Sequence, residues 1–304
     1  MGVAIPQPTL GCYGSRLMSV EIEVAESLPH ALELLSPADP LIRPVAGATD
    51  LILRLHGGRL TARRLVSIAD LPELSFITAE PDALCVGAGT AISDLLSHAE
   101  VRAELPAAVQ SAREFASPQI RNRATLGGNL GNASPAADLI PPLISFGATV
   151  TLRSWRGTRQ LPVEDLFLGM GKTAVAPDEL ITVIRIPRRK GYFQAFAKFG
   201  SRSANIISVV NAALCLKLED DRIAEARVAY GSVAPKPLRA AQVEAALLGR
   251  TLNEALVDEM AAIVPLDAKP IDDVRGTRRY KLHLAVTATQ DALSRALATL
   301  REGH

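Results

Sequence analysis

A stretch of small and polar residues in the middle of the chain, at positions 124–142, has the composition of a diphosphate-binding loop. Its glycines let a ligand approach the backbone and permit the positive φ that converging amides need. Hydroxyl and amide side chains add neutral donors, and one carboxylate could accept hydrogen bonds from a ribose or an adenine amine. These residues are Thr125, Gly127, Gly128, Asn129, Gly131, Asn132, Ser134 and Asp138. A glycine-rich turn without a ligand is the alternative interpretation.

A second candidate anion site comes earlier in the chain. Residues 41–46 are predicted to form a short strand that ends at Gly47, and Thr49 or Asp50 can cap a helix through 51–55. Unpaired amides and the helix dipole at such a junction both favour a phosphate.

The elements that must position these segments follow an α+β pattern. Short strand-like runs alternate with helical ones up to a cluster of charge, proline and glycine at 187–191, which predicts a domain boundary. Before it we predict helices at 26–35, 92–98, 105–115 and 139–146, and strands at 66–68, 84–86, 148–152 and 179–186. After it we predict strands at 195–199, 208–218 and 224–230, a turn at 219–221, a helix with a capping box at Thr251 and Glu254, and a final helix at 277–301.

Length and composition limit the possible classes of protein. The chain has 304 residues, of which 48% are hydrophobic and 21% charged, enough for two domains with their own cores. A net charge of +1 gives no general attraction for nucleic acid or anionic membrane. No apolar run has membrane-spanning length, and residues 1–17 lack the features of a signal peptide. We therefore expect a cytoplasmic protein with no nucleic-acid or membrane partner, and an N-terminal extension at 1–17.

Cysteine and histidine spacing argues against a metal centre in this chain. Cys12, Cys85 and Cys215 are isolated, whereas iron–sulfur and structural zinc sites use closely spaced cysteines. The five histidines are equally scattered, and no pair stands at ligand spacing with a carboxylate. We predict neither metal ligands nor catalytic residues.

Two other nucleotide motifs are incomplete. Residues 169–173 resemble the end of an ATPase phosphate loop, but Leu166 stands where its first glycine is required. Gly87 and Gly89 resemble the start of a dinucleotide fingerprint, yet Ile92 replaces its third glycine. A nucleoside triphosphatase and a Rossmann domain are both disfavoured.

Two motifs together resemble the FAD-binding subunit of the molybdenum hydroxylases, a family that includes the flavin domain of xanthine dehydrogenase and the medium subunit of carbon monoxide dehydrogenase. The first is Arg-Pro-Val-Ala-Gly-Ala-Thr-Asp-Leu at 43–51, and the second runs from Pro118 to Asp138. The similarity continues through 172–187, 195–198, 231–234 and 273–280, and covers roughly residues 18–300.

The resemblance implies a fold and a cofactor. Residues 18–188 would form an α+β, two-subdomain FAD-binding domain of the vanillyl-alcohol-oxidase (PCMH) type, split near 57–62. Residues 191–304 would form a C-terminal α+β domain of the CO dehydrogenase flavoprotein type. The backbone at 45–51 and 125–129 would hold the diphosphate, Phe115 would lie by the isoalloxazine ring and Ile181 by the adenine. The cofactor-binding residues so implied are Arg43, Val45, Ala46, Gly47, Ala48, Thr49, Asp50, Leu51, Phe115, Thr125, Gly127, Gly128, Asn129, Asn132, Asp138, Lys172, Ile181 and Lys198.

The resemblance also implies a role in electron transfer. A molybdopterin-binding large subunit would oxidise the substrate, and a small subunit with 2Fe–2S clusters would pass the electrons to FAD on this chain, in a dimer of heterotrimers. The alternatives are a self-sufficient flavin oxidoreductase on the same fold and a scaffold subunit that has lost FAD. Ala48, where the family often has a second glycine, is the only feature that favours the scaffold, because a positive φ there would cost alanine about 1 kcal/mol.

Overall fold

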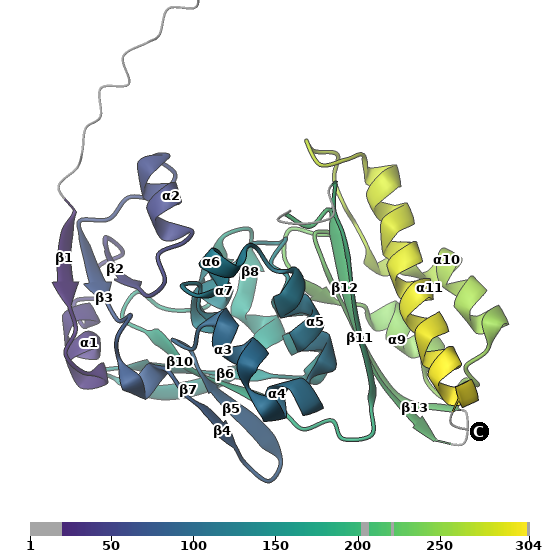
Figure 1. The fold of residues 1–304 in the computed structure, drawn as a ribbon. Helices are drawn as coiled ribbons and strands as arrows, with labels where there is room; N and C mark the ends of the chain where they lie inside the picture. Colours follow the sequence, from purple (N-terminus) through teal and green to yellow (C-terminus); the bar gives the residue numbers. More distant parts are fainter. Residues whose placement is uncertain (1–19, 202–206, 220–221, 303–304) are drawn as a thin grey trace, which may run out of the picture.

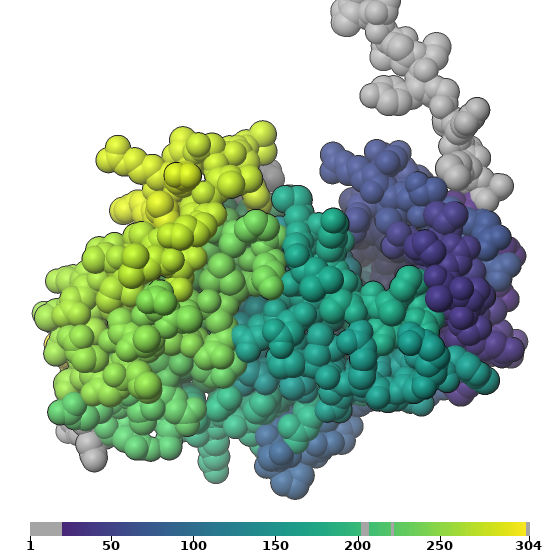
Figure 2. Space-filling view, turned by 180° about the vertical axis from the view of Figure 1, so that it is seen from behind, coloured from purple at the N-terminus to yellow at the C-terminus, as the bar shows by residue number. Residues whose placement is uncertain are grey.

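The computed structural model describes residues 20–201, 207–219 and 222–302. Three main sheets follow one another along the molecule, as the ribbon shows (Figure 1). Seen from behind, the purple segment that begins at residue 20 and the yellow C-terminal helix lie at opposite ends, with the teal middle of the chain between them (Figure 2). The predicted extension at 1–17 and most of the turn at 219–221 lie outside the described residues.

The first subdomain is a small parallel sheet in the order β1-β3-β2. Helix α1 packs against it, and Ala31, Leu35, Val66 and Leu74 belong to one buried core. Its elements are β1 (Glu21–Val24), α1 (Leu28–Leu35), β2 (Ile42–Val45), α2 (Leu51–His56) and β3 (Arg64–Ser67). The predicted split near 57–62 is too early, because β3 comes after it and pairs with both β1 and β2.

The second subdomain is an antiparallel sheet in the order β4-β5-β10-β6-β7, covered by short helices. The sheet and the helices share one buried core with members such as Leu84, Ile92, Phe146 and Ile184. Its strands are β4 (Ile77–Ala79), β5 (Ala83–Gly87), β6 (Thr149–Ser154), β7 (Gly157–Pro162), β10 (Leu180–Pro187) and the separate hairpin β8 (Phe167–Gly169) and β9 (Lys172–Thr173). Its helices are α3 (Ile92–Ser97), α4 (Ala99–Glu104), α5 (Pro106–Glu114), α6 (Pro118–Arg121), α7 (Leu126–Asn132) and α8 (Ile140–Phe146).

The C-terminal domain is an antiparallel sheet in the order β11-β12-β13-β14, with α9, α10 and α11 on one face. Its elements are β11 (Phe193–Phe199), β12 (Val210–Glu219), β13 (Arg222–Gly231), β14 (Leu238–Arg239), α9 (Ala241–Leu247), α10 (Glu254–Asp267) and α11 (Arg278–Glu302). The predicted capping box is wrong: Asn253 caps α10 by accepting a hydrogen bond from the amide of Leu256, while Thr251 forms a β-bridge with Arg222.

The two domains share buried contacts across this sheet. Successive side chains of a strand point to opposite faces. In β12, Ala212 and Leu214 belong to the core beneath α9–α11, whereas Ala213 and Cys215 belong to the core of the second subdomain, where α5 and α8 cover the sheet. A sheet that is apolar on both faces therefore joins the C-terminal helices to the second subdomain.

Candidate functional site

A cavity of about 350 Å³ lies between the first and second subdomains, within the range of roughly 300–1,000 Å³ typical of small-molecule sites. It is lined by the β2–α2 loop, by α7 and the residues before it, by Phe115, and by the segment that leads into β10. Apart from Asp138, Lys172 and Lys198, every cofactor-binding residue implied by the sequence lines this cavity. Tertiary structure thus brings together two motifs that are far apart in the sequence.

The β2–α2 loop, residues 46–50, presents unpaired backbone donors. No acceptor within the described parts of the chain pairs with the amides of residues 47–51. Asp50 precedes α2 but makes no side-chain capping bond, so the predicted cap by Thr49 or Asp50 is not formed. Ala48 adopts φ 61°, which confirms that this position needs the left-handed region. Several unpaired N–H groups in one turn favour an anion.

The second motif is a helix rather than the predicted loop. Residues 126–132 form α7, and none of its glycines has positive φ. Thr125 caps the helix, accepting the Gly128 amide at 3.0 Å. The amides of Leu126, Gly127 and Asn129 donate to carbonyls of Thr90, Ala88 and Thr125. Since these donors are already used, the expectation that amides of this segment converge on an anion is wrong.

Glycines nevertheless decide how the two motifs meet. A Cβ on Gly47 would lie 1.8 Å from the carbonyl oxygen of Arg123, which belongs to the second motif and precedes α7. A Cβ on Gly127 would lie 2.5 Å from the Cβ of Ala88 and 2.7 Å from its carbonyl oxygen. These distances are far below van der Waals contact. These glycines therefore allow close packing of backbone on backbone, and this is what forms the cavity wall.

Two guanidinium groups give the cavity a positive side. Arg43 and Arg54 both line it, and neither forms an ion pair with an acidic residue of the described chain. Arg54 lies on α2 and donates from Nη1 to Asn132 Oδ1 at 3.0 Å, across the cavity. Burial lowers the pKa of Arg43, and the charge of Arg54 lowers it further. Two neighbouring like charges that form no ion pair are typical of an anion site.

Arg54 was not predicted from the sequence. The sequence did contain a signal for this residue. Residues four apart lie on the same side of a helix, so a cation four residues after Asp50, where α2 begins, faces the same side as the start of the helix. Asn129 adds a further polar group: its Oδ1 is buried, and no partner for it is found in the described part of the chain. A ligand in the cavity that supplies a donor would satisfy this buried oxygen.

An ion pair fixes the part of the cavity wall that leads into β10. Arg159 binds the carboxylate of Glu179 at 2.7 and 2.8 Å, and Glu179 also accepts the amide of Ala176 at 2.8 Å. The hydrogen bonds from Arg159 keep the pKa of Glu179 below its usual range. This fixes the turn before β10, from which Ile181 lines the cavity.

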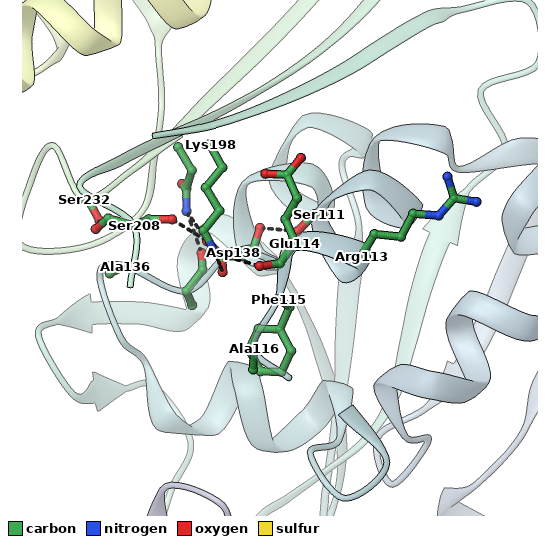
Figure 3. Close-up of polar contacts among 12 residues, drawn as sticks. Ser111, Arg113, Glu114, Phe115, Ala116, Ala136, Asp138, Lys198, Ser208 and Ser232 are labelled. Atoms are coloured by element: carbon green, nitrogen blue, oxygen red, sulfur yellow. Dashed lines mark hydrogen bonds and ion pairs between the residues drawn. The ribbon is translucent and has the colours of Figure 1, made fainter. Parts of the chain in front are cut away.

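Three implied cofactor contacts are not supported by the geometry. Lys172 is exposed on β9 outside the cavity. The Asp138 carboxylate is buried and accepts Lys198 Nζ at 2.7 Å, Ser208 Oγ at 2.5 Å and Asn211 Nδ2 at 3.0 Å (Figure 3). With its oxygens engaged inside the protein, Asp138 is not available to a ribose or an adenine, and Lys198 is buried with it.

Comparison with known proteins identifies the family. Residues 18–189 match the FAD binding domain in molybdopterin dehydrogenase, and residues 194–296 match the CO dehydrogenase flavoprotein C-terminal domain. The chain belongs to this flavoprotein family. The xanthine dehydrogenase FAD-binding subunit of Escherichia coli O157:H7 is 32% identical over 277 residues, or 90% of this chain and 94% of the relative. The glyceraldehyde dehydrogenase medium chain of Sulfolobus acidocaldarius is 33% identical over 268 residues, or 88% and 95%.

Solved structures of other flavoprotein family members have the same fold. A chain of carbon monoxide dehydrogenase from Hydrogenophaga pseudoflava superposes with a TM-score of 0.88 at 29% identity, covering 92% of this chain and 97% of that one. A chain of quinoline 2-oxidoreductase from Pseudomonas putida 86 superposes with a TM-score of 0.86 at 26% identity, covering 91% of this chain and 96% of that one. The predicted family, fold class, FAD cofactor and oxidoreductase class are confirmed.

The residues of the flavoprotein cavity fit FAD. Unpaired amides and two guanidinium groups suit a diphosphate, and the unpaired Asn129 oxygen can accept from a bound ligand. In the described ranges, no helix is long and apolar enough to cross a membrane. The same residues include no group of three or more His, Cys, Asp or Glu arranged to hold a metal.

Proposed function

We propose that this chain is the electron-transfer subunit of a heteromeric molybdenum hydroxylase. It would take electrons from 2Fe–2S clusters of a small partner subunit, while a molybdopterin-binding large subunit oxidises the substrate. Bound FAD supplies the redox chemistry and releases the electrons to an external acceptor. Relatives named medium chains of carbon monoxide dehydrogenase, and a subunit of a 6-hydroxypseudooxynicotine dehydrogenase complex, support this arrangement. A dimer of heterotrimers and a cytoplasmic location remain predictions from the sequence.

The make-up of the cavity wall is the observation that carries this proposal. Its ionisable side chains in the described chain are Arg43, Arg54, Asp50 and Glu179, and the last is engaged by Arg159. Arg43, Arg54 and the 47–51 amides would hold the diphosphate. Phe115 and Ile181 would supply apolar contact to the flavin and adenine rings. The hydrogen bond between Arg54 and Asn132 across the cavity would help to keep water from these rings. These are the means of holding a cofactor, and the described residues of the wall include no histidine or cysteine that could act on a substrate.

Cysteine burial supports the same interpretation. Burial raises the pKa of Cys85 to about 11 and that of Cys215 to about 12, so both remain neutral thiols near pH 7. The scaffold alternative rests on Ala48 alone, and Ala48 still adopts the left-handed conformation, at a cost of about 1 kcal/mol, beside amides that stay unpaired. Among the described residues, Asp50 is the cavity acid that forms no ion pair, and a self-sufficient oxidoreductase would have to rely on it.

The test is to express the full chain with and without its partners. We expect the purified chain to carry one FAD, with absorbance at about 450 nm, and to copurify with a molybdopterin subunit and an iron–sulfur subunit. In rapid mixing, substrate should reduce the flavin of the complex but not that of the isolated chain. Substrate turnover by the isolated chain would support the self-sufficient oxidoreductase instead, and a flavin-free chain would overturn both.

A further inference from the structure

The turn between α5 and α6 brings Phe115 to the cavity. Phe115 is the C-cap residue of α5 and lines the cavity, and the next residue, Ala116, has φ 42°. The last carbonyl groups of a helix have no partner within the helix. A non-glycine residue in the left-handed region persists only where its surroundings hold it there. The conformation of this turn therefore depends on contacts from outside α5.

Two cations supply those contacts, one from each domain. Arg121, on α6, donates from Nη1 to the carbonyls of Arg113, Phe115 and Ala116 at 3.1, 2.8 and 3.0 Å. Lys198, on β11 of the C-terminal domain, donates from Nζ to the carbonyl of Glu114 at 2.9 Å. Four successive carbonyls, 113–116, are thus held by two side chains.

Lys198 is itself fixed in place. Its side chain is 4% exposed, and its Nζ lies 2.7 Å from the carboxylate of Asp138, which is 7% exposed. Asn211, paired with Lys198 across β11 and β12, binds the same carboxylate, as does Ser208. The backbone carbonyl of Asp138 accepts Ser111 Oγ from α5 at 2.8 Å. Figure 3 shows this network directly beside the turn that carries Phe115.

We propose that Lys198 is a positioning residue through which the C-terminal domain sets the orientation of Phe115 at the flavin. The inference rests on the proposed FAD site. Lys198 does not line the cavity, so it acts through the Glu114 carbonyl and not as a ligand. A buried ion pair alone is weak evidence of a stabilising role. Here the pair spans two domains, and its lysine also binds the carbonyl of Glu114, the residue directly before Phe115.

The experiment compares Lys198→Met with Lys281→Met in the full chain. Lys281 is a matched control in the C-terminal domain: it is 1% exposed, donates to the Ile271 carbonyl at 2.8 Å and pairs with Asp273 at 2.8 Å, but does not line the cavity. We expect Lys198→Met to release FAD several-fold faster and to change the visible circular dichroism, fluorescence and midpoint potential of the flavin. Lys281→Met should leave all of these signals at their original values, even if it unfolds more easily.

Two further variants keep the proposal falsifiable. Lys198→Met/Asp138→Asn removes both charges of the buried pair, so it should fold even if Lys198→Met alone does not. It should show the same flavin change, because the backbone carbonyl of Glu114 still lacks its donor. Phe115→Leu should change the flavin signals itself, and adding Lys198→Met to it should change them little further.

Unchanged flavin signals in folded Lys198→Met or in the double variant would overturn the proposal. Equal changes in Lys281→Met, or full additivity with Phe115→Leu, would also overturn it. Failure of the unmodified chain to bind FAD would instead overturn the proposed function.

Discussion

The β2–α2 loop and α7 line the same cavity but differ in what they leave free. The loop has unpaired amides at 47–51 and the two guanidinium groups that flank it. The first turn of α7 has used its amides on Thr90, Ala88 and Thr125, and offers mainly side-chain groups of Asn129 and Asn132. The glycine-rich segment is thus a prepacked wall, while the less conspicuous loop carries the donors and charge suited to a diphosphate. Glycine content alone does not show which segment binds an anion.

The largest effect should come from the point where the two segments meet. Gly47→Ala would place a Cβ 1.8 Å from the Arg123 carbonyl oxygen, so the backbone must move apart. We expect a loss of about 3 kcal/mol in the free energy of unfolding, and no retained FAD. Gly131→Ala is the control for stability alone, since nothing in the protein lies within 4 Å of its added Cβ but the residue itself lines the cavity. Denaturant unfolding and flavin content measure both, and a stable, FAD-loaded Gly47→Ala would contradict the packing argument.

Removing charge from the loop side should weaken the cofactor without unfolding the protein. Arg54→Gln should cost about 1.5–3 kcal/mol in FAD binding, roughly a tenfold to hundredfold rise in Kd, if the guanidinium contacts the diphosphate. Titration should show a similar loss for ADP, none for riboflavin, and a weaker dependence on salt than in the original chain. Arg59→Gln makes the same change of charge on an exposed residue outside the cavity, and should bind FAD normally. Equal losses in both variants would exclude a specific role for Arg54.

A smaller effect is expected on the α7 side. Thr125→Val keeps the shape of the side chain but leaves the Gly128 amide without its capping acceptor, which should cost about 1 kcal/mol of stability. FAD affinity should fall, because the cavity wall frays. Asn253→Ala removes a similar cap from α10. It should lower stability by a similar amount and leave FAD affinity unchanged. Should the two variants bind FAD equally well, α7 would not need its cap to form the wall.

The smallest effect has the opposite sign. Ala48→Gly relieves a left-handed alanine at φ 61° but adds chain entropy to the unfolded state, so the net gain in stability should be about 0.5–1 kcal/mol. FAD affinity should stay the same, since the amides keep their positions. Thermal unfolding with and without FAD measures both. A loss of stability would mean that the loop does not hold this conformation in solution.

Most elements of the second subdomain and the C-terminal sheet could be predicted, because apolar periodicity is local. Strand β5 at 83–87 and helix α8 at 140–146 lie almost where the pattern places them. Features that depend on distant partners could not be predicted. The pairing of β3 with β1 and β2 moves the subdomain boundary, and the packing of α7 on Ala88 turns an expected loop into a helix.

The sequence by itself determined the family, the cofactor and about half of the residues that line the cavity, since the residues of each motif are contiguous and their small size is local information. Only the tertiary structure decided which of them are free to bind. Asp138 carries a carboxylate that could bind a ligand, yet Ser208 and Asn211, some seventy positions away, donate hydrogen bonds to it. Arg54 has no motif, yet the fold brings it to the cavity opposite Asn132. A hydrogen bond is exclusive and depends on distance in space, and neither property can be read from neighbours along the chain.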